Sequence, residues 1–207
     1  MTLTTESVQE LPSRLRVVHD GTAPDLAAAE RAAAAFMTAL RIPLDDPDLA
    51  DTPRRLAHAY AELLDVPEYD FTTFPNAEQY DELVLVQDIP VQSVCEHHLL
   101  PFRGVAHVGY LPAARIVGLS KLARTVDHFA RRPQTQERLT MQVARHLDEK
   151  LTPRGVGVVV EAEHTCMTLR GARAHDTRTV TSSMLGHLRD EPAARAEFLS
   201  LTRQAAR

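Results

Sequence analysis

Apolar residues recur every three or four positions in two segments near the start of the chain, and this spacing predicts two helices. The first covers residues 26–40 and follows Asp25, a residue type that often caps a helix. The second covers residues 52–64, where Thr52 is the expected cap and Pro53 lies in the first turn, in which a missing N–H has no cost.

From about residue 81 the pattern changes to runs of β-branched residues, which are typical of strands. Helical spacing returns in the middle of the chain and near its end. Strands are predicted at 82–97, at 104–112 and 114–119 as a hairpin around Pro112, and at 155–171; helices are predicted at 120–132, 135–151 and 192–203. The order of the elements predicts an α+β fold: helices come first, then strands around a central helix pair, and then a closing helix.

The sequence has no internal repeat and no low-complexity linker, so we expect one domain over residues 25–207. Within it, residues 25–80 form a helical arm and residues 81–207 form the core. Residues 1–24 have no apolar period and are predicted to be a flexible N-terminal tail.

The composition is that of an ordinary globular chain, with 44% apolar and 25% charged residues over 207 positions. No apolar run approaches the roughly 20 residues that a membrane helix needs, so no membrane partner is expected. The start of the chain lacks the basic and apolar pattern of a secretory signal, which predicts a cytoplasmic location. A net charge of −5 and the absence of Trp argue against a nucleic-acid partner.

The densest chemistry of the chain is the run Cys95-Glu96-His97-His98. A thiol and an imidazole three positions apart can bind one zinc ion from a tight turn. In a straight strand Cys95 and His98 would face opposite sides, so the chain must bend here if both bind the same metal.

The second cysteine, Cys166, follows His164 in a segment that we expect to be a strand, where His164, Cys166 and Arg170 would share a face. Three ligands and one water would make a catalytic zinc site with an open position: Cys95, His98 and Cys166. His97 and His164 would then be free for proton transfer. Two alternatives stay open: the cysteines are buried core thiols, or both adjacent histidines join a closed structural site.

The helix predicted from residue 120 has two cations in its first turn. Ser120 is a natural cap, and Lys121 and Arg124 are neighbours on one face because they are three positions apart. Free N–H groups and cations at a helix start favour a phosphate group, to which Arg55 and Arg170 could add forked contacts. Taken alone, basic residues on a polar helix face are more often simply solvated.

Gln136 and Glu137 begin the next predicted helix. A carboxylate beside an amide can accept hydrogen bonds from the N1–H and N2–H2 edge of guanine. A glutamate that complements the helix dipole is the commoner reason for this pattern.

Together these residues resemble the GTP cyclohydrolase I family over residues 28–203. Five motifs in order carry the resemblance: Asp51–Arg55, Ser93–His98, Gly118–Arg124, Arg132–Thr140, and His164–Met167 with Arg170 and Gly171. The resemblance implies a tunnelling-fold subunit in a homodecamer of two stacked pentamers, with active sites between subunits. It also implies conversion of GTP and water to 7,8-dihydroneopterin triphosphate and formate, the first step towards folate or tetrahydrobiopterin.

The resemblance implies a role for each motif residue. Zinc, one ion per subunit, is expected on three ligands: Cys95, His98 and Cys166. Proton transfer and ribose binding are expected from His97, His164 and Ser120. Guanine is expected on Glu137 with Gln136, and the triphosphate on four cations: Lys121, Arg124, Arg170 and Arg55.

Two positions depart from the family pattern. His58 stands where a lysine usually follows the Thr-Pro arginine by one turn, which would make triphosphate binding depend on pH. Val105 stands at another position that is usually lysine, and we have no physical account of its effect. Two alternatives remain: an enzyme that stops at the formamide or serves a specialised pathway such as 7-deazapurine synthesis, and a non-enzymatic ring stabilised by zinc.

Overall fold

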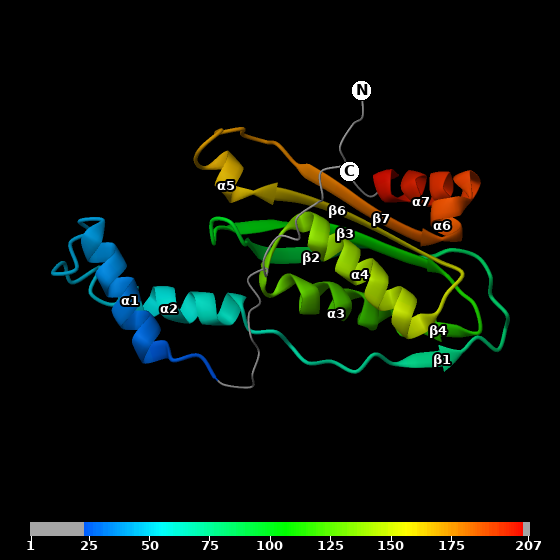
Figure 1. The fold of residues 1–207 in the computed structure, drawn as a ribbon, viewed down its shortest axis with the longest axis horizontal. Helices are drawn as coiled ribbons and strands as arrows, with labels where there is room; N and C mark the ends of the chain where they lie inside the picture. Colours follow the sequence, from blue (N-terminus) through cyan, green and yellow to red (C-terminus); the bar gives the residue numbers. More distant parts are fainter. Residues whose placement is uncertain (1–22, 205–207) are drawn as a thin grey trace, which may run out of the picture.

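The computed structural model describes residues 23–204 as an arm of two helices beside a five-stranded sheet (Figure 1). The predicted tail, residues 1–24, lies almost entirely outside the described residues. Over the described part of the chain, no helix combines the length and the apolar character that crossing a membrane requires.

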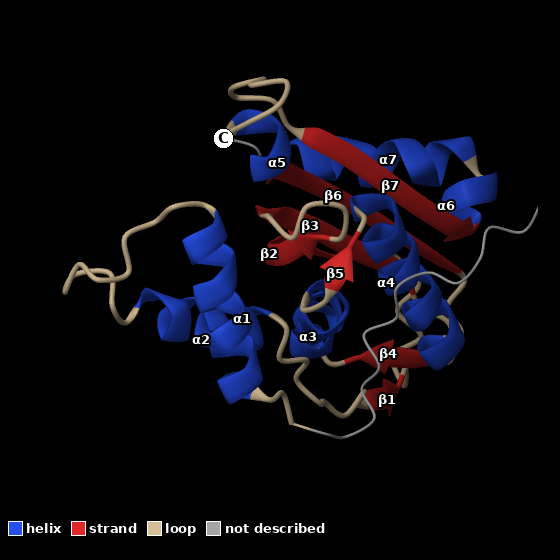
Figure 2. Cartoon of the chain, turned by 60° about the vertical axis from the view of Figure 1, so that its left-hand side comes forward, coloured by secondary structure: helices blue, strands red, loops and turns tan. Residues whose placement is uncertain are grey.

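The arm consists of α1 (Leu26–Ala39) and α2 (Thr52–Leu63), which pack on each other to one side of the sheet (Figures 1 and 2). The Tyr60 hydroxyl in α2 donates to the backbone oxygen of Leu99 at 2.6 Å. This hydrogen bond ties the arm to the turn that follows the first long strand of the core.

The structure confirms one of the three predicted helix caps and corrects the other two. Asp25 caps α1 as predicted, since its carboxylate accepts a hydrogen bond from a first-turn backbone N–H at 2.9 Å. The cap of α2 is Asp51, one residue earlier than predicted, and Thr52 is the first helical residue. Gly118 occupies the cap position of the third helix, so the expectation that Ser120 caps it is wrong and Ser120 lies inside the first turn.

The sheet has the strand order β5–β2–β3–β6–β7, and every neighbouring pair is antiparallel except β5–β2. Its strands are β2 (Val84–Cys95), β3 (Pro101–Leu111), β5 (Pro133–Gln134), β6 (Gly155–His164) and β7 (Thr179–Gly186). A separate pair is formed by β1 (Thr73–Pro75) and β4 (Arg115–Val117). The predicted hairpin around Pro112 is therefore wrong, because β4 pairs with β1 and not with β3.

Helices cover both faces of the sheet (Figure 2). On one face, α3 (Leu119–Ala130) and α4 (Gln136–Leu151) bury the larger core against β2, β3 and β6. On the other face, α6 (His187–Asp190) and α7 (Pro192–Gln204) bury a smaller cluster around Phe198. The predicted α+β class, with an antiparallel sheet and a packed helix pair, is confirmed.

The strand order gathers three chain segments at one end of the sheet. β2 and β6 run in the same direction on either side of β3, so their last residues flank its first residues. The register places Val94 opposite Pro101, and Phe102 opposite His164. β5 adds the start of α4 to the same end, since Gln134 pairs with Cys95.

Gly104 allows the close approach of β3 and β6. A Cβ at this position would overlap the backbone oxygen of Glu161 and lie 2.6 Å from Cα of Ala162. We predict that Gly104→Ala lowers the free energy of unfolding by about 3 kcal/mol, because backbone atoms of both strands must shift. Gly118→Ala is the control: its nearest contact would be 3.6 Å, and the loss should stay below about 1 kcal/mol. Urea denaturation measures both variants, and equal losses would contradict this account.

Candidate active site

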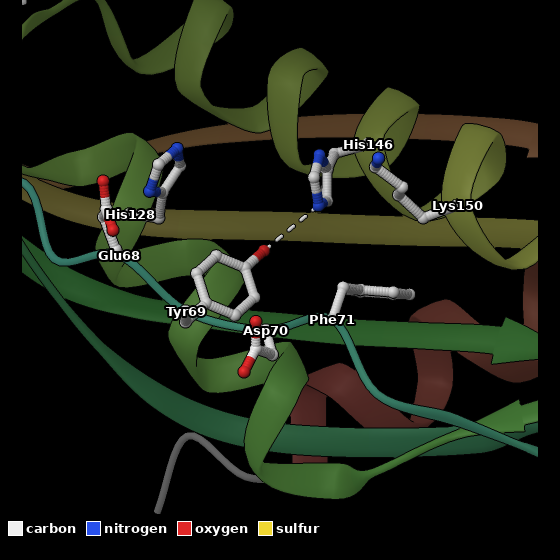
Figure 3. Close-up of a pocket in the computed structure, with 7 residues that line it drawn as sticks. All are labelled: Glu68, Tyr69, Asp70, Phe71, His128, His146 and Lys150. Carbon is white, nitrogen blue, oxygen red and sulfur yellow. Dashed lines mark hydrogen bonds between the residues drawn. The ribbon is translucent and has the colours of Figure 1, made fainter.

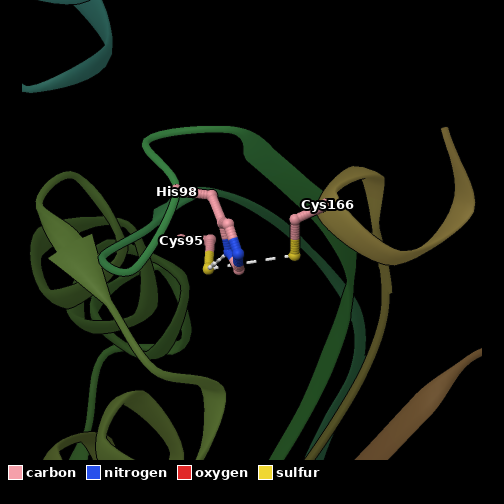
Figure 4. A group of neighbouring side chains, drawn as sticks. All are labelled: Cys95, His98 and Cys166. Carbon is pink, nitrogen blue, oxygen red and sulfur yellow. Dashed lines mark hydrogen bonds between the residues drawn. The ribbon is translucent and has the colours of Figure 1, made fainter. Parts of the chain in front are cut away.

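Three metal-binding side chains converge at the end of the sheet (Figure 4). Cys95 is the last residue of β2, His98 lies in the turn that follows, and Cys166 lies in the short helix α5 (Thr165–Thr168). Cys95 Sγ is 3.6 Å from His98 Nδ1 and 3.9 Å from Cys166 Sγ. The ligand atoms of all three residues lie within 4.8 Å of one another, so one ion can reach them all.

The turn after Cys95 brings His98 back beside it. The backbone N–H of Leu99 donates to the Cys95 oxygen at 2.8 Å, and the Cys95 N–H donates to the Leu100 oxygen at 2.8 Å. Leu99 has a φ of 53°, a left-handed conformation that reverses the chain. The bend that the sequence required for a shared metal is therefore present.

Cys166 reaches the same point by a different route from the one expected. β6 ends at His164, and Cys166 belongs to α5, so the prediction of a strand whose residues share a face at His164, Cys166 and Arg170 is wrong. The Thr165 hydroxyl donates to the backbone oxygen of Pro101 at 2.6 Å and anchors α5 to the start of β3. This anchor places the Cys166 sulfur beside Cys95.

The donor set fits zinc, which prefers thiolates and imidazoles in a four-coordinate site. Three protein ligands leave a fourth position open, as catalytic zinc sites require. Burial, reinforced by the neighbouring Cys95 sulfur, raises the pKa of the Cys166 thiol, while the Arg170 charge acts in the opposite direction. A cation bound between the two sulfurs would favour the Cys166 thiolate, which this environment otherwise disfavours.

His97 lies beside this group but outside it. Its Nδ1 is 4.0 Å from Cys95 Sγ, and its side chain is 65% exposed. Its Nε2 is 3.8 Å from Glu96 Oε1, and the other carboxylate oxygen of Glu96 pairs with Arg138 of α4. Sequence reasoning missed this Glu96–Arg138 pair, because no local pattern links the turn to α4.

His164 is held rigidly at the end of β6. Its ring stacks on Phe102, with the ring centroids 4.5 Å apart and the planes 14° apart. Its Nε2 lies 2.8 Å from Gln136 Oε1. Burial lowers the pKa of His164, and the nearby carboxylate of Glu137 partly opposes this.

Gln136 and Glu137 are neighbours in sequence but not in environment. Gln136 is 1% exposed and its side-chain amide is hydrogen-bonded within the chain, whereas Glu137 is exposed on the first turn of α4. Successive residues of a helix point in different directions, so one faces the sheet and the other faces solvent. Of the two, Glu137 is placed to meet a ligand.

The basic residues of α3 lie at the other end of that helix. Ser120, Lys121 and Arg124 are in or next to its first turn, whereas its last residue, Ala130, accepts a hydrogen bond from the Ser93 hydroxyl at 2.6 Å, close to Cys95. Ala130 lies nine positions after Lys121 in the helix, which is roughly 14 Å of rise. Within one chain, the metal group and this basic cluster are therefore far apart.

The remaining predicted residues lie in two places. Arg170 follows α5 and is near enough to influence the Cys166 thiol. Arg55 and His58 are exposed on α2 in the arm, where Arg55 is 3.6 Å from the Asp51 carboxylate. Within the described residues, no hydrogen bond or ion pair joins either side chain to the metal group of its own chain, although Tyr60 ties α2 to Leu99 beside His98.

A separate pocket of about 550 Å³ lies between residues 68–71 and helices α3 and α4 (Figure 3). Tyr69 is hydrogen-bonded to His146 across it at 3.1 Å, and burial lowers the pKa of His146. The predicted site residues do not line this pocket.

The two sulfur atoms predict the fate of the protein when metal is removed. We expect the chelated, metal-free protein to form a Cys95–Cys166 disulfide in air, because its sulfurs are only 3.9 Å apart. Thiol titration should then find no free thiols per chain, while zinc-loaded protein resists the same exposure. Cys166→Ala, which keeps one thiol, should still titrate one. Two persistent thiols in the metal-free protein would contradict the prediction.

Comparisons with known proteins agree with this geometry. The sequence model of the family described as GTP cyclohydrolase I matches residues 29–203. A GTP cyclohydrolase 1 of Streptomyces griseus is 55% identical over 181 residues, which cover 83% of this chain and 89% of the relative. A GTP cyclohydrolase 1 of Mycobacteroides abscessus is 53% identical over 179 residues, which cover 83% and 88%.

One solved structure, the apo form of an archaeosine synthase QueF-Like protein, matches 50% of this chain and 93% of its own. Its identity is 18% and its TM-score 0.41, so this likeness carries no argument about the site. The family match spans nearly all of the described residues, and the two relatives are similar over most of both chains. The chain belongs to the GTP cyclohydrolase I family.

Proposed function

We propose that this chain hydrolyses and rearranges GTP to 7,8-dihydroneopterin triphosphate with release of formate, using one zinc ion held by Cys95, His98 and Cys166. One observation carries the proposal: in a member of this family, three side chains that could hold a metal ion lie within 4.8 Å of one another, at the sheet end where β6 delivers His164. The product would enter cytoplasmic pterin synthesis, towards folate or tetrahydrobiopterin.

The first half of the reaction needs water to add to C8 of guanine, which is a poor electrophile. Zinc, when bound, supplies the Lewis acidity that makes water nucleophilic near neutral pH. His164 would give a proton to guanine N7 as the water adds, and a second hydrolysis would release formate. The exposed carboxylate of Glu137 would hold the N1–H and N2–H2 edge of the base during both steps.

The second half opens the ribose and rearranges it. His97 fits this role better than His164, because it is largely exposed at the rim of the metal group and is not stacked on the core. An imidazole can accept a proton on one nitrogen and donate one from the other, so it can both take and return a proton as the sugar ring opens. Ser120 would contact the ribose.

The triphosphate would be bound by Lys121, Arg124 and Arg170. Lys121 and Arg124 lie at the end of α3 that is remote from their own metal group, so we propose that they complete the site of a second copy. Arg55 and His58 extend from the arm and would reach a site in the same way. This division supports the assembly that the family pattern implies, a decamer of two pentamers with active sites between subunits.

GTP turnover by the purified protein tests the proposal. We predict that the zinc-loaded protein releases formate and yields a product that fluoresces as neopterin after oxidation. Cys166→Ala should lose both signals by losing the metal, whereas His164→Ala should keep zinc and lose turnover by about 100-fold or more. His175→Ala, at an exposed position, is the matched control and should behave as wild type.

Two outcomes would contradict the proposal. Formate without neopterin would show an enzyme that stops at an earlier intermediate. No formate from protein that contains one zinc per chain would contradict it as well: loss of GTP would then show an enzyme that stops at the formamide, and unchanged GTP a metal site with another purpose.

A further inference from the structure

The side chain of Gln136 is buried at the junction of α4, β6 and β7. Its Nε2 donates to the backbone oxygens of Val160 and Thr179, both at 2.9 Å. Backbone oxygens only accept hydrogen bonds, so the amide nitrogen must face these two atoms. These partners therefore determine which end of the amide is the nitrogen and which is the oxygen.

The orientation of the amide determines the state of His164. Gln136 Oε1 lies 2.8 Å from His164 Nε2, and an amide oxygen cannot donate. His164 Nε2 must therefore carry hydrogen, and in the neutral ring the lone pair is on Nδ1. The stacked contact with Phe102 fixes the plane in which this lone pair lies.

Two threonines lie around Gln136, but the backbone oxygens of Val160 and Thr179 set the orientation of its amide. The Thr140 hydroxyl donates to the Gln136 backbone oxygen at 2.7 Å, so it must accept the hydrogen of Thr181 in their 2.6 Å contact. Thr181 Oγ1 lies 3.2 Å from Gln136 Nε2, but both amide hydrogens are donated to Val160 and Thr179, so this longer contact can only share one of them. Every polar group of the Gln136 side chain has a partner within the chain, and turning the amide over would break both backbone hydrogen bonds.

We infer that Gln136 is a positioning residue and not a guanine ligand: it holds His164 with hydrogen on Nε2, so that His164 exchanges protons with the substrate through Nδ1. The inference rests on the proposed function for the role of His164 in the reaction. It assigns to Gln136 the same task that carboxylates and backbone oxygens perform for other catalytic histidines, which is to fix the tautomer and the ring orientation.

Kinetics separate the two roles of Gln136. In the zinc-loaded, full-length protein, Gln136→Met removes the amide but keeps a side chain of similar length. We expect kcat for formate release to fall about 10- to 100-fold, while the Kd for GTP changes by less than about threefold. Thr181→Val is the matched control, because it removes one hydroxyl of the network and leaves the Gln136–His164 contact; its kcat should stay within about threefold of wild type. A Kd for GTP weakened about tenfold by Gln136→Met, with kcat retained, would overturn the inference.

The tautomer itself can be measured without any substitution in Gln136. Nitrogen-15 NMR of histidine-labelled, zinc-loaded protein at about pH 8.5, where the lowered pKa of His164 leaves its ring neutral, distinguishes a nitrogen that carries hydrogen from one that does not. The His164 signals are identified by their loss in His164→Gln. Hydrogen on Nε2 is the expected result, and hydrogen on Nδ1 would overturn the inference even if Gln136→Met fails to fold. Because this measurement needs no turnover, failure of the inference is distinguishable from failure of the proposed function, which would show as an absence of formate.

Discussion

The antiparallel pairing of β3 with both β2 and β6 is the constraint on which the site depends. It makes the last residues of β2 and β6 flank the start of β3. The sulfur atoms of Cys95 and Cys166 are therefore 3.9 Å apart, although the two residues are 71 positions apart in the sequence. The same pairing stacks His164 on Phe102, its partner in the register. The short β5 strand then delivers the start of α4, with Gln136 and Glu137, to the same end. Membership of the GTP cyclohydrolase I family also confirms the predicted tunnelling fold.

The longer helices, most strands and the metal residues could be predicted from local patterns, whereas the four-residue helices α5 and α6 could not. Apolar spacing located α3, α4 and α7 to within two residues, and cysteine–histidine proximity in the sequence identified Cys95, His98 and Cys166. Features that depend on tertiary contacts could not be predicted. β1 is three residues long and forms because it pairs with β4; β4 is predictable as a strand, but this pairing is not. The burial of β7 alternates, but its sequence TVTSSMLG has too few apolar residues to show this. The sequence around Cys166 predicts a strand, but the hydrogen bond between the Thr165 hydroxyl and the Pro101 backbone oxygen favours a helical turn.

The environment of Gln136 also depends on tertiary contacts and could not be predicted from local sequence. A glutamine next to a glutamate at a helix start suggests two polar groups facing one ligand, but helix geometry turns one of them into the core. Its four partners lie on β6, β7 and at His164, and none is near it in sequence. Burying an amide is unfavourable unless its hydrogen bonds are satisfied. Gln136 therefore requires these partners, and the partners in turn require an amide at this position. The length of α3 similarly separates its basic residues from the metal group of the same chain, so under the proposed function one chain would hold only part of a site.

Mixing two inactive variants tests most directly whether the metal group of one chain works with the basic cluster of another. Cys166→Ala removes the metal, and Lys121→Ala combined with Arg124→Ala removes the cations of α3. If the site is shared between copies, oligomers assembled from equal amounts of both should regain roughly a quarter of wild-type turnover, as random pairing at a shared interface requires. Mixed oligomers that form but stay inactive would contradict the account, because each chain would then need both groups for its own site.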